Sequence, residues 1–419
     1  MLALLAGDMG RCKVPGDLAE VTRIDHDAET PPELVDMTAK GVERIWHAAE
    51  KLYDTGLHPA ITLVIRRRGQ IVLKRAIGCL SGNAPRDDGP LVPLDPDAPL
   101  CLFSASKAVS ALLIHKLSEE GKLRLEDRVS HHLPEFAAQG KESVTIRQLL
   151  SHRAGIPSIP FDNPQPEMLL DWDATVQAMC AAAPDAPIFE RQAYHALTSG
   201  FIIGELVRRV SGRELPDVLR EWFAAPLGCR YLTYGLAPDF RALAPKNACT
   251  GPKPFWPITN YVKRIVGVPF ERAVESSNHD AYLSAIVPAG NIYASADDAC
   301  RVFQMLLNHG ELDGTRVLRA DTIAEATRPI GPIQVDGILG VPLRFSAGFM
   351  LGENPFGLYG PSCPQAFGHL GFISVMCWAD PERDIAVSLL NTGKSVAPGG
   401  VLRLAALLTA ISRACPPVS

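Results

Sequence analysis

Ser104 and Lys107 form the pattern S-x-x-K, the spacing with the clearest chemical potential in this sequence of 419 residues. Residues three apart on a helix share one face, so the lysine nitrogen can reach the hydroxyl one turn before it. A serine becomes an effective nucleophile when a base removes its proton, and a lysine whose pKa is lowered by desolvation can be that base. The alternative is a serine near a helix N-cap beside an exposed lysine. The tetrapeptide by itself favours that simpler interpretation.

Several other familiar sites are absent from the sequence. NTGKS at 391–395 resembles the end of a phosphate-binding loop, but Ser388 stands where the motif needs its first glycine. No serine lies in a G-x-S-x-G elbow, no H-E-x-x-H pair exists, and His131 and His132 lack further ligands at useful spacing. The ten cysteines form no C-x-x-C pair, so we expect free, buried thiols. We therefore predict no metal site and no cofactor.

Hydrophobic spacing predicts the elements that position the S-x-x-K pair. Residues 1–36 show no sustained period and are expected to be irregular. An amphipathic helix is expected from Gly41 to just before Gly56, and ITLVIRRRGQIVLKRAIG predicts a β-hairpin. We expect the basic residues of this hairpin to form a solvated rim; they are Arg66, Arg67, Arg68, Lys74 and Arg75.

A long helical block follows the hairpin. The helix that carries Ser104 near its start should end at Gly121, and helical patterns continue to about residue 290. Ser295 and Asp298 predict a capping box at the start of another helix. Two strands joined through Asp380 and Pro381 and a final helix close the chain.

This order of elements predicts an α/β (α+β) protein with an inserted helical domain. Residues 1–125 and 291–419 would form one discontinuous α/β domain, which carries the nucleophile helix. Residues 126–290 would form the insertion. The charge balance of 41 basic against 46 acidic residues gives a net charge of −5, which argues against a nucleic-acid partner. No apolar run is long enough to span a membrane, and the cysteine usage suits a reducing compartment, so we predict a cytoplasmic protein.

Five segments in order resemble the serine β-lactamase and penicillin-binding superfamily. FSASKAVSALLIHKLSEEGKLRLEDRV resembles its nucleophile helix and VTIRQLLSHRAGIP the segment after it. AYHALTSGFIIGELVRRVSG resembles the Y-x-N region, VPAGNIYASADDACRVFQMLLNHGELDG a helix near the end of the insertion, and FGHLGFISVMCWADPERD the K-T-G strand. The resemblance covers residues 40–415, and five ordered matches are far more specific than one S-x-x-K. It implies an antiparallel sheet flanked by helices, the β-lactamase/DD-peptidase-like fold.

Within the superfamily the sequence is similar to the class C β-lactamase-like esterases, the family VIII carboxylesterases. The resemblance implies that Ser104 is the nucleophile, Lys107 its proton partner and Tyr194, in the insertion, the first residue of Y-x-N. A phenol whose pKa is lowered by a neighbouring ammonium can carry a proton between serine and leaving group. Tyrosines are also common core residues. The resemblance also implies that the N–H groups of Ser104 and Phe372 form an oxyanion hole.

The sequence departs from the family pattern at two positions that bear on substrate choice. Ala196 stands in place of the asparagine of Y-x-N, and His369, Leu370 and Gly371 replace K-T-G. The first change removes an amide, and the second replaces a fixed charge with a histidine that is charged only in part near neutral pH. Neutral esters therefore become more plausible substrates than anionic β-lactams. His369 could equally be a structural residue at a strand end.

Two further histidines carry weaker expectations. We expect His152 to be a packing residue rather than a base. His195, beside Tyr194, can point either way.

These observations predict a serine hydrolase that cleaves small carboxylic esters through an acyl-enzyme on Ser104. The alternatives are an acyltransferase of the same fold, as in lovastatin-type enzymes, a weak β-lactamase or D-peptidase, and a binding or sensor module without turnover. A small-molecule ester is the expected partner. The natural ester and the oligomeric state stay open.

Overall fold

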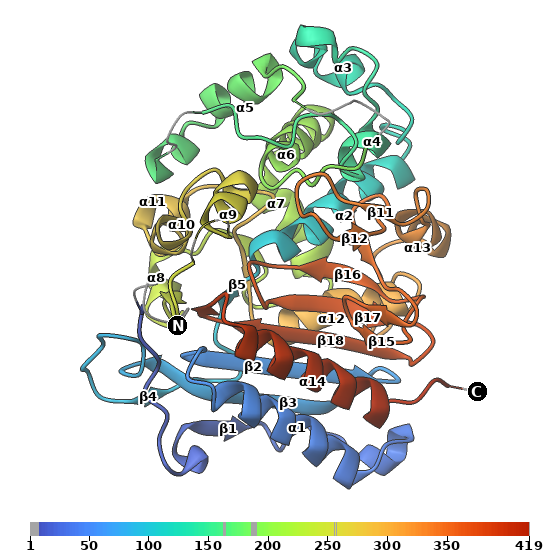
Figure 1. Cartoon of the computed structure of the whole chain (residues 1–419). Coiled ribbons are helices and arrows are strands. Elements are labelled where there is room, and N and C mark those ends of the chain that lie inside the picture. Colours follow the sequence, from blue (N-terminus) through green and yellow to red (C-terminus); the bar gives the residue numbers. More distant parts are fainter. Residues whose placement is uncertain (1–7, 162–164, 186–190, 255, 257, 419) are drawn as a thin grey trace.

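The computed structural model describes residues 8–161, 165–185, 191–254, 256 and 258–418. An eight-stranded antiparallel sheet forms its centre, with the strand order β1-β3-β2-β18-β17-β16-β13 and with β4 paired to β3 (Figure 1). The strands are β1 (Thr22–Ile24), β2 (Ala60–Arg67), β3 (Gln70–Ser81), β4 (Val92–Pro93), β13 (Met350–Leu351), β16 (Phe367–Leu370), β17 (Met376–Asp380) and β18 (Ile385–Asn391). Because β2 pairs with β18, the two ends of the chain share one sheet. The expected mixed fold with an antiparallel sheet is confirmed.

Helices cover both faces of this sheet. Helix α12 (Ala296–Leu307) packs on one face against β2, β17 and β18, and α1 (Ala39–Tyr53) and α14 (Pro398–Ala414) pack together on the other (Figure 1). The alternation of side chains along β2 explains this arrangement. Ala60 and Val64 join the core on the α12 side, whereas Ile61, Leu63 and Ile65 join the core on the α1 side.

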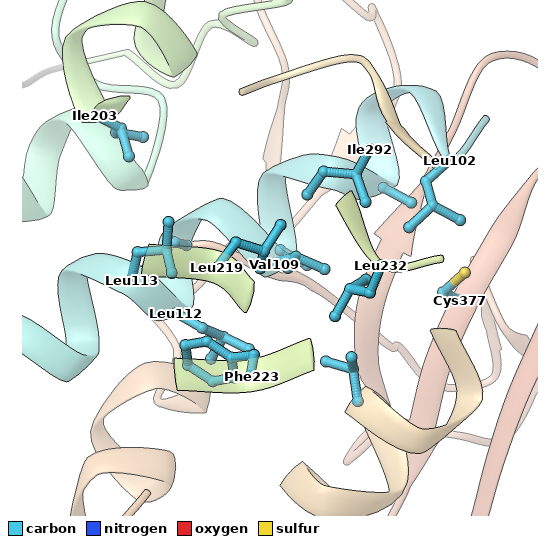
Figure 2. Close-up of a cluster of buried hydrophobic side chains, with 14 of the residues drawn as sticks. Leu102, Val109, Leu112, Leu113, Ile203, Leu219, Phe223, Leu232, Ile292 and Cys377 are labelled. Atoms are coloured by element: carbon cyan, nitrogen blue, oxygen red, sulfur yellow. The ribbon is translucent and has the colours of Figure 1, made fainter. Parts of the chain in front are cut away.

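The nucleophile helix lies in the middle of the protein. The short 3-10 helix η3 (Phe103–Ala105) leads directly into α2 (Ser106–Glu119), and eleven of the fourteen α2 residues are buried. A helix buried on all sides must be surrounded by other elements. Figure 2 shows the apolar cluster around it, where Val109, Leu112 and Leu113 meet side chains from other elements such as Phe223.

The remaining helices lie mostly between α2 and α12 in the chain, and many of them sit above the sheet in Figure 1. They are α3 (Val129–His132), η4 (Pro134–Gly140), α4 (Ile146–Leu150), η5 (Pro166–Leu170), α5 (Trp172–Ala181), α6 (Thr198–Ser211), α7 (Leu215–Leu219), η6 (Arg220–Ala224), α8 (Pro238–Arg241), α9 (Ile258–Val266), α10 (Phe270–Ser276), α11 (Asp280–Ser284) and, after α12, α13 (Ala320–Thr327).

Short strands outside the central sheet form several small sheets. A three-stranded sheet of β5 (Leu100–Cys101), β8 (Ile292–Ala294) and β6 (Thr233–Tyr234) lies beside the nucleophile turn, and β19 (Gly393–Lys394) pairs in parallel with β7 (Ala248–Cys249). Three two-stranded pairs complete the structure: β9 (Glu311–Leu312) with β10 (Thr315–Arg316), β11 (Gln334–Val335) with β12 (Pro342–Leu343), and β14 (Phe356–Gly357) with β15 (Gly360–Pro361). The N-terminal region, expected to be irregular, contains β1 and the 3-10 helices η1 (Leu18–Val21) and η2 (Pro32–Val35).

The expectation of a solvated basic rim on the hairpin is wrong. Arg66, Arg67, Lys74 and Arg75 are buried. Arg66 pairs with Asp297 at 2.8 Å and Arg75 with Glu29 at 2.8 Å. Burial of a cation requires a partner, and these side chains are paired with carboxylates of α12, of the N-terminal segment and of Asp97, and with backbone carbonyls. Only Arg68 at the turn is exposed among the five.

Other local predictions are confirmed. Ser295 and Asp298 form a reciprocal capping box at the start of α12, and β17 and β18 are joined after Asp380 as expected. All ten cysteines are free thiols, and eight are buried. No helix in the described part of the chain is both long and apolar enough to cross a lipid bilayer.

Candidate active site

Ser104 lies in a strained turn at the start of the nucleophile helix. The preceding residue, Phe103, has φ of +48°, a conformation that bulky side chains rarely adopt. Strand β8 holds the turn on both sides, because Leu102 N–H donates to Ile292 O at 2.8 Å and Ile292 N–H donates to Ser106 Oγ at 3.0 Å. Strain of this kind persists where the surroundings determine the backbone, and it is common at functional sites.

Lys107 meets Ser104 as the spacing predicts. Its Nζ lies 3.1 Å from Ser104 Oγ, 2.7 Å from Ala196 O and 3.1 Å from Ala289 O. Burial lowers the pKa of Lys107 well below its usual value, and no carboxylate among the described residues forms an ion pair with it. A neutral amine has two N–H groups and one lone pair. Lys107 Nζ is placed as a donor to Ser104 Oγ and to both carbonyls; when the lysine is deprotonated, the two carbonyls accept its two N–H groups and its lone pair accepts the proton of the Ser104 hydroxyl.

Tyr194 is the third member of the cluster. It lies in the segment between α5 and α6, and Lys107 Nζ lies 4.8 Å from the centre of its ring. Its backbone N–H donates to Asp336 Oδ1 at 3.1 Å, which holds this segment against the loop after β11. Burial raises the pKa of Tyr194, and its contact with the Ser104 hydroxyl opposes that rise. The expectation that the phenol pKa is lowered is therefore wrong, because desolvation of the buried phenol outweighs its contact with the Ser104 hydroxyl.

His369 lies on β16, behind Tyr194. The side chain is buried, the two rings are 6.2 Å apart, and Nδ1 donates to Leu370 O at 2.6 Å. Burial, with a smaller contribution from Lys107, lowers the pKa of His369 to about 3. The expected partial charge is therefore absent: the ring is neutral near neutral pH and offers no cation to a substrate carboxylate.

Gly371 and Phe372 bring the end of β16 against the nucleophile turn. A Cβ on Gly371 would lie 2.5 Å from Leu102 O, so only glycine permits this approach. The Gly371 N–H donates to Val375 O at 2.7 Å and is already occupied. In the described structure neither the Ser104 N–H nor the Phe372 N–H has a protein acceptor. The first helical N–H groups have no acceptor within their helix, so the Ser104 N–H is available.

The other two histidines have structural hydrogen bonds. His195 Nε2 accepts from Ile156 N–H at 3.2 Å and its Nδ1 donates to Ala193 O at 2.6 Å, so both ring nitrogens are occupied. His152 Nδ1 accepts from His195 N–H at 3.1 Å. These bonds fix the segment before Tyr194 and favour a packing role for both rings.

Sequence reasoning missed three contributors to this site. The sequence draws attention to Ala196 only because it lacks the side-chain amide of the Y-x-N asparagine, but its backbone carbonyl is an acceptor for Lys107. Ala289 lies 182 residues from Lys107 in the chain, and Asp336 lies 142 residues from Tyr194. The VPAGN segment, which contains Ala289, is part of the resemblance. Every residue has a backbone carbonyl, however, so the residue type does not indicate this contact.

A pocket of about 420 Å³ opens at Ser104 and Tyr194. Phe372 forms part of its wall and packs between Phe103 and Phe270, with ring centres 5.7 and 5.6 Å apart. A half-buried hydroxyl, an amine of lowered pKa, a phenol and two available N–H groups at the edge of a pocket are the parts required for acyl transfer to serine.

Comparison with known proteins agrees with this geometry. Residues 48–410 match the Beta-lactamase family. The chain belongs to the beta-lactamase family. It is 30% identical over 311 residues to Esterase/beta-lactamase LipL of Mycobacterium tuberculosis, which covers 72% of this chain and 70% of that protein.

Two solved structures of related proteins have the same fold as this beta-lactamase family member. A penicillin-binding protein homolog from Caulobacter crescentus superposes with a TM-score of 0.76 at 30% identity, covering 89% of this chain and 97% of the other. A family VIII carboxylesterase superposes with a TM-score of 0.76 at 28% identity, covering 90% and 98%. The protein is thus a hydrolase of the beta-lactamase fold.

Proposed function

We propose that this protein is a serine carboxylesterase that acts through an acyl-enzyme on Ser104. The observation that carries the proposal is the position of Lys107, a buried amine without a carboxylate partner among the described residues, 3.1 Å from the serine hydroxyl. A desolvated amine is a base near neutral pH, which is what a serine nucleophile requires.

The first half of the reaction forms the acyl-enzyme. Ser104 Oγ attacks the ester carbonyl while its proton moves to Lys107 Nζ, and the N–H groups of Ser104 and Phe372 bind the oxyanion. The tetrahedral intermediate then expels the alcohol. Tyr194, a neutral phenol, donates the proton that the leaving oxygen needs, and Lys107 returns its proton to Tyr194.

The second half reverses these roles with water. As water attacks the acyl carbon, Tyr194 accepts a proton from it and passes its own phenolic proton to Lys107; Lys107 then gives this proton to Ser104 Oγ as the acid departs. The protein ends with Lys107 and Tyr194 in their starting protonation states. Transfer of the acyl group to an alcohol instead of water would use the same steps.

The environment of the site favours esters over β-lactams. Ala196 has no side-chain amide, and His369 is neutral and buried, so neither can bind the polar groups that a penicillin presents. An anionic substrate would enter a pocket without a compensating charge, which is costly.

Replacement of Ser104 by alanine tests the nucleophile. We expect Ser104→Ala to abolish hydrolysis of nitrophenyl acetate and labelling by a serine-reactive phosphonate, while circular dichroism shows a folded protein. Ser118→Ala on α2 is the matched control, because Ser118 is partly exposed and makes no side-chain hydrogen bond. Ser106 would be a poor control, since Ile292 N–H depends on its hydroxyl. Turnover by Ser104→Ala would refute the assignment. Absence of phosphonate labelling in the wild-type protein would favour a binding module, because only a serine poised for acylation reacts with the probe.

A further inference from the structure

The pocket in front of Ser104 is larger than a short ester needs. Its volume of about 420 Å³ falls in the range of about 300–1,000 Å³ that is typical of sites for drug-sized ligands. An acetyl group on Ser104 would fill only a small part of it. The unused volume must therefore be explained by a larger part of the substrate or by water.

The chemistry of the walls argues against water. Most lining side chains are apolar, and none of the described lining residues has a charged side chain. Polar groups in the wall bond within the protein: Tyr282 Oη donates to Gly290 O at 2.5 Å, and Ser277 Oγ donates to Val274 O at 2.6 Å. The side chain of Gln165 accepts a hydrogen bond from Arg272. Water in such a space would find few partners.

The pocket also extends well beyond the serine. Helix α6 packs against both α2 and α5, and the pocket includes Ser104 of η3, directly before α2, and Met179 on α5. Packed helices lie about 8–10 Å apart, so a pocket that reaches from one to the other spans more than one such distance. Val262 and Ile265 of α9 and Ala273 of α10 also line it. The result is an elongated apolar chamber with Ser104 and Tyr194 as its reactive edge.

From this chamber we infer that the substrates are uncharged lipophilic esters with a hydrocarbon portion of medium length, from hexanoyl to decanoyl in size. This inference rests on the proposed function, because it names the substrate class of the same serine. The chain of the substrate lies along the apolar walls, and its ester carbonyl lies at the N–H groups of Ser104 and Phe372. A charged group at the far end of the chain would be buried without a counter-ion and is excluded.

Two ester series test the chain length. Each buried methylene contributes about fourfold in binding, so nitrophenyl octanoate should exceed nitrophenyl acetate by about a hundredfold or more in kcat/KM. A parallel series of alkyl acetates shows whether the alcohol side uses the chamber. A gain with chain length in either series supports the inference. Equal or falling kcat/KM from acetate to octanoate in both series would overturn it.

An ester of the same length as the octanoate ester, but with a terminal carboxylate, tests whether the pocket lacks a cationic side chain. The nitrophenyl monoester of octanedioic acid matches the octanoate ester but ends in a carboxylate. We expect its kcat/KM to be about a hundredfold lower, because no lining side chain can pair with the charge. Equal turnover of the two esters would show that the hydrocarbon chain of the substrate does not lie in this pocket and would overturn the inference.

Two variants on α10 test where the hydrocarbon chain of the substrate lies. Ala273→Phe places a ring in the chamber, and we expect it to lower the ratio of octanoate to acetate kcat/KM by about tenfold or more. Glu275→Phe adds the same ring on the exposed side of α10 and should leave the ratio unchanged. An unchanged ratio in Ala273→Phe would overturn the inference.

Binding to the inactive protein separates this inference from the proposed function. Titration of Ser104→Ala with methyl octanoate should release heat with a negative heat-capacity change, and methyl acetate should show no binding. If the wild-type protein cleaved no ester while Ser104→Ala bound methyl octanoate, the proposed esterase function would fail and the apolar pocket would stand. If esters were cleaved but methyl octanoate did not bind, the inference would fail.

Discussion

Lys107 and Tyr194 differ from the pair expected from their types alone. A lysine with its usual pKa would be an ammonium and would lower the pKa of a neighbouring phenol. Burial instead lowers the pKa of Lys107 and raises that of Tyr194, so desolvation disfavours the charged form of both groups. The amine is then the base for Ser104, and the phenol is the acid for the leaving alcohol.

Tyr194→Phe tests the phenol without changing the ring. If Tyr194 donates the proton to the leaving group, kcat for an alkyl ester such as ethyl acetate, whose alkoxide must be protonated to leave, should fall by about 10²-fold or more with little change in KM. Steady-state kinetics of the purified variant provide the measurement. A rise in KM with unchanged kcat would instead make Tyr194 a residue that binds substrate.

At the scale of elements, the site depends on the contact between β16 and η3. The two elements come from opposite ends of the chain, and Gly371 allows them to meet because it has no Cβ. That contact sets the distance between the N–H groups of Ser104 and Phe372. A small displacement of β16 would therefore weaken both donors to the oxyanion together.

Gly371→Ala tests this contact. The added methyl would press on Leu102 O and on Val375, so we expect kcat/KM to fall by about tenfold to a hundredfold while the protein stays folded. The control is Gly399→Ala at the start of α14, where a Cβ meets nothing within 4 Å. Full activity in Gly371→Ala would mean that the position of β16 does not limit the reaction.

At the scale of the whole molecule, the buried Lys394 makes stability depend on pH. Its Nζ donates to Asn391 O at 2.9 Å and lies 4.6 Å from the Phe103 ring, and no carboxylate in the described structure pairs with it. Burial lowers its pKa to about 7. Between about 7 and the unfolded value of about 10.4, the unfolded chain binds more protons than the folded protein, so stability rises with pH in this window.

Lys394→Met removes this buried amine while keeping a similar shape. We expect the free energy of unfolding near neutral pH to rise, on the order of a few kcal/mol, and its slope between neutral and alkaline pH to become flatter. Urea unfolding at several pH values provides the measurement. Lys40→Met, at an exposed position, should change neither quantity. A destabilised variant with an unchanged slope would show that Lys394 is charged and well solvated in the folded protein.

Local patterns in the sequence determined much of the fold. Helix periodicity placed Lys107 beside Ser104, and the hairpin, the capping box at Ser295 and the paired C-terminal strands follow from interactions within a few residues. Five ordered segments were sufficient to name the superfamily. The division into residues 1–125 with 291–419 and an insertion at 126–290 stays a prediction, although β2 and β18 share a sheet.

Tertiary structure alone decided the electrostatics and the pocket. The states of Lys107, Tyr194 and His369 depend on desolvation by segments far away in the chain, and the same enclosure buries the hairpin cations that the sequence suggested were solvated. The carbonyls of Ala196 and Ala289 act through backbone atoms that every residue has. A residue type specifies which proton a side chain can hold, but its folded neighbours determine whether it holds that proton, because charge in a low-dielectric interior is stable only with partners.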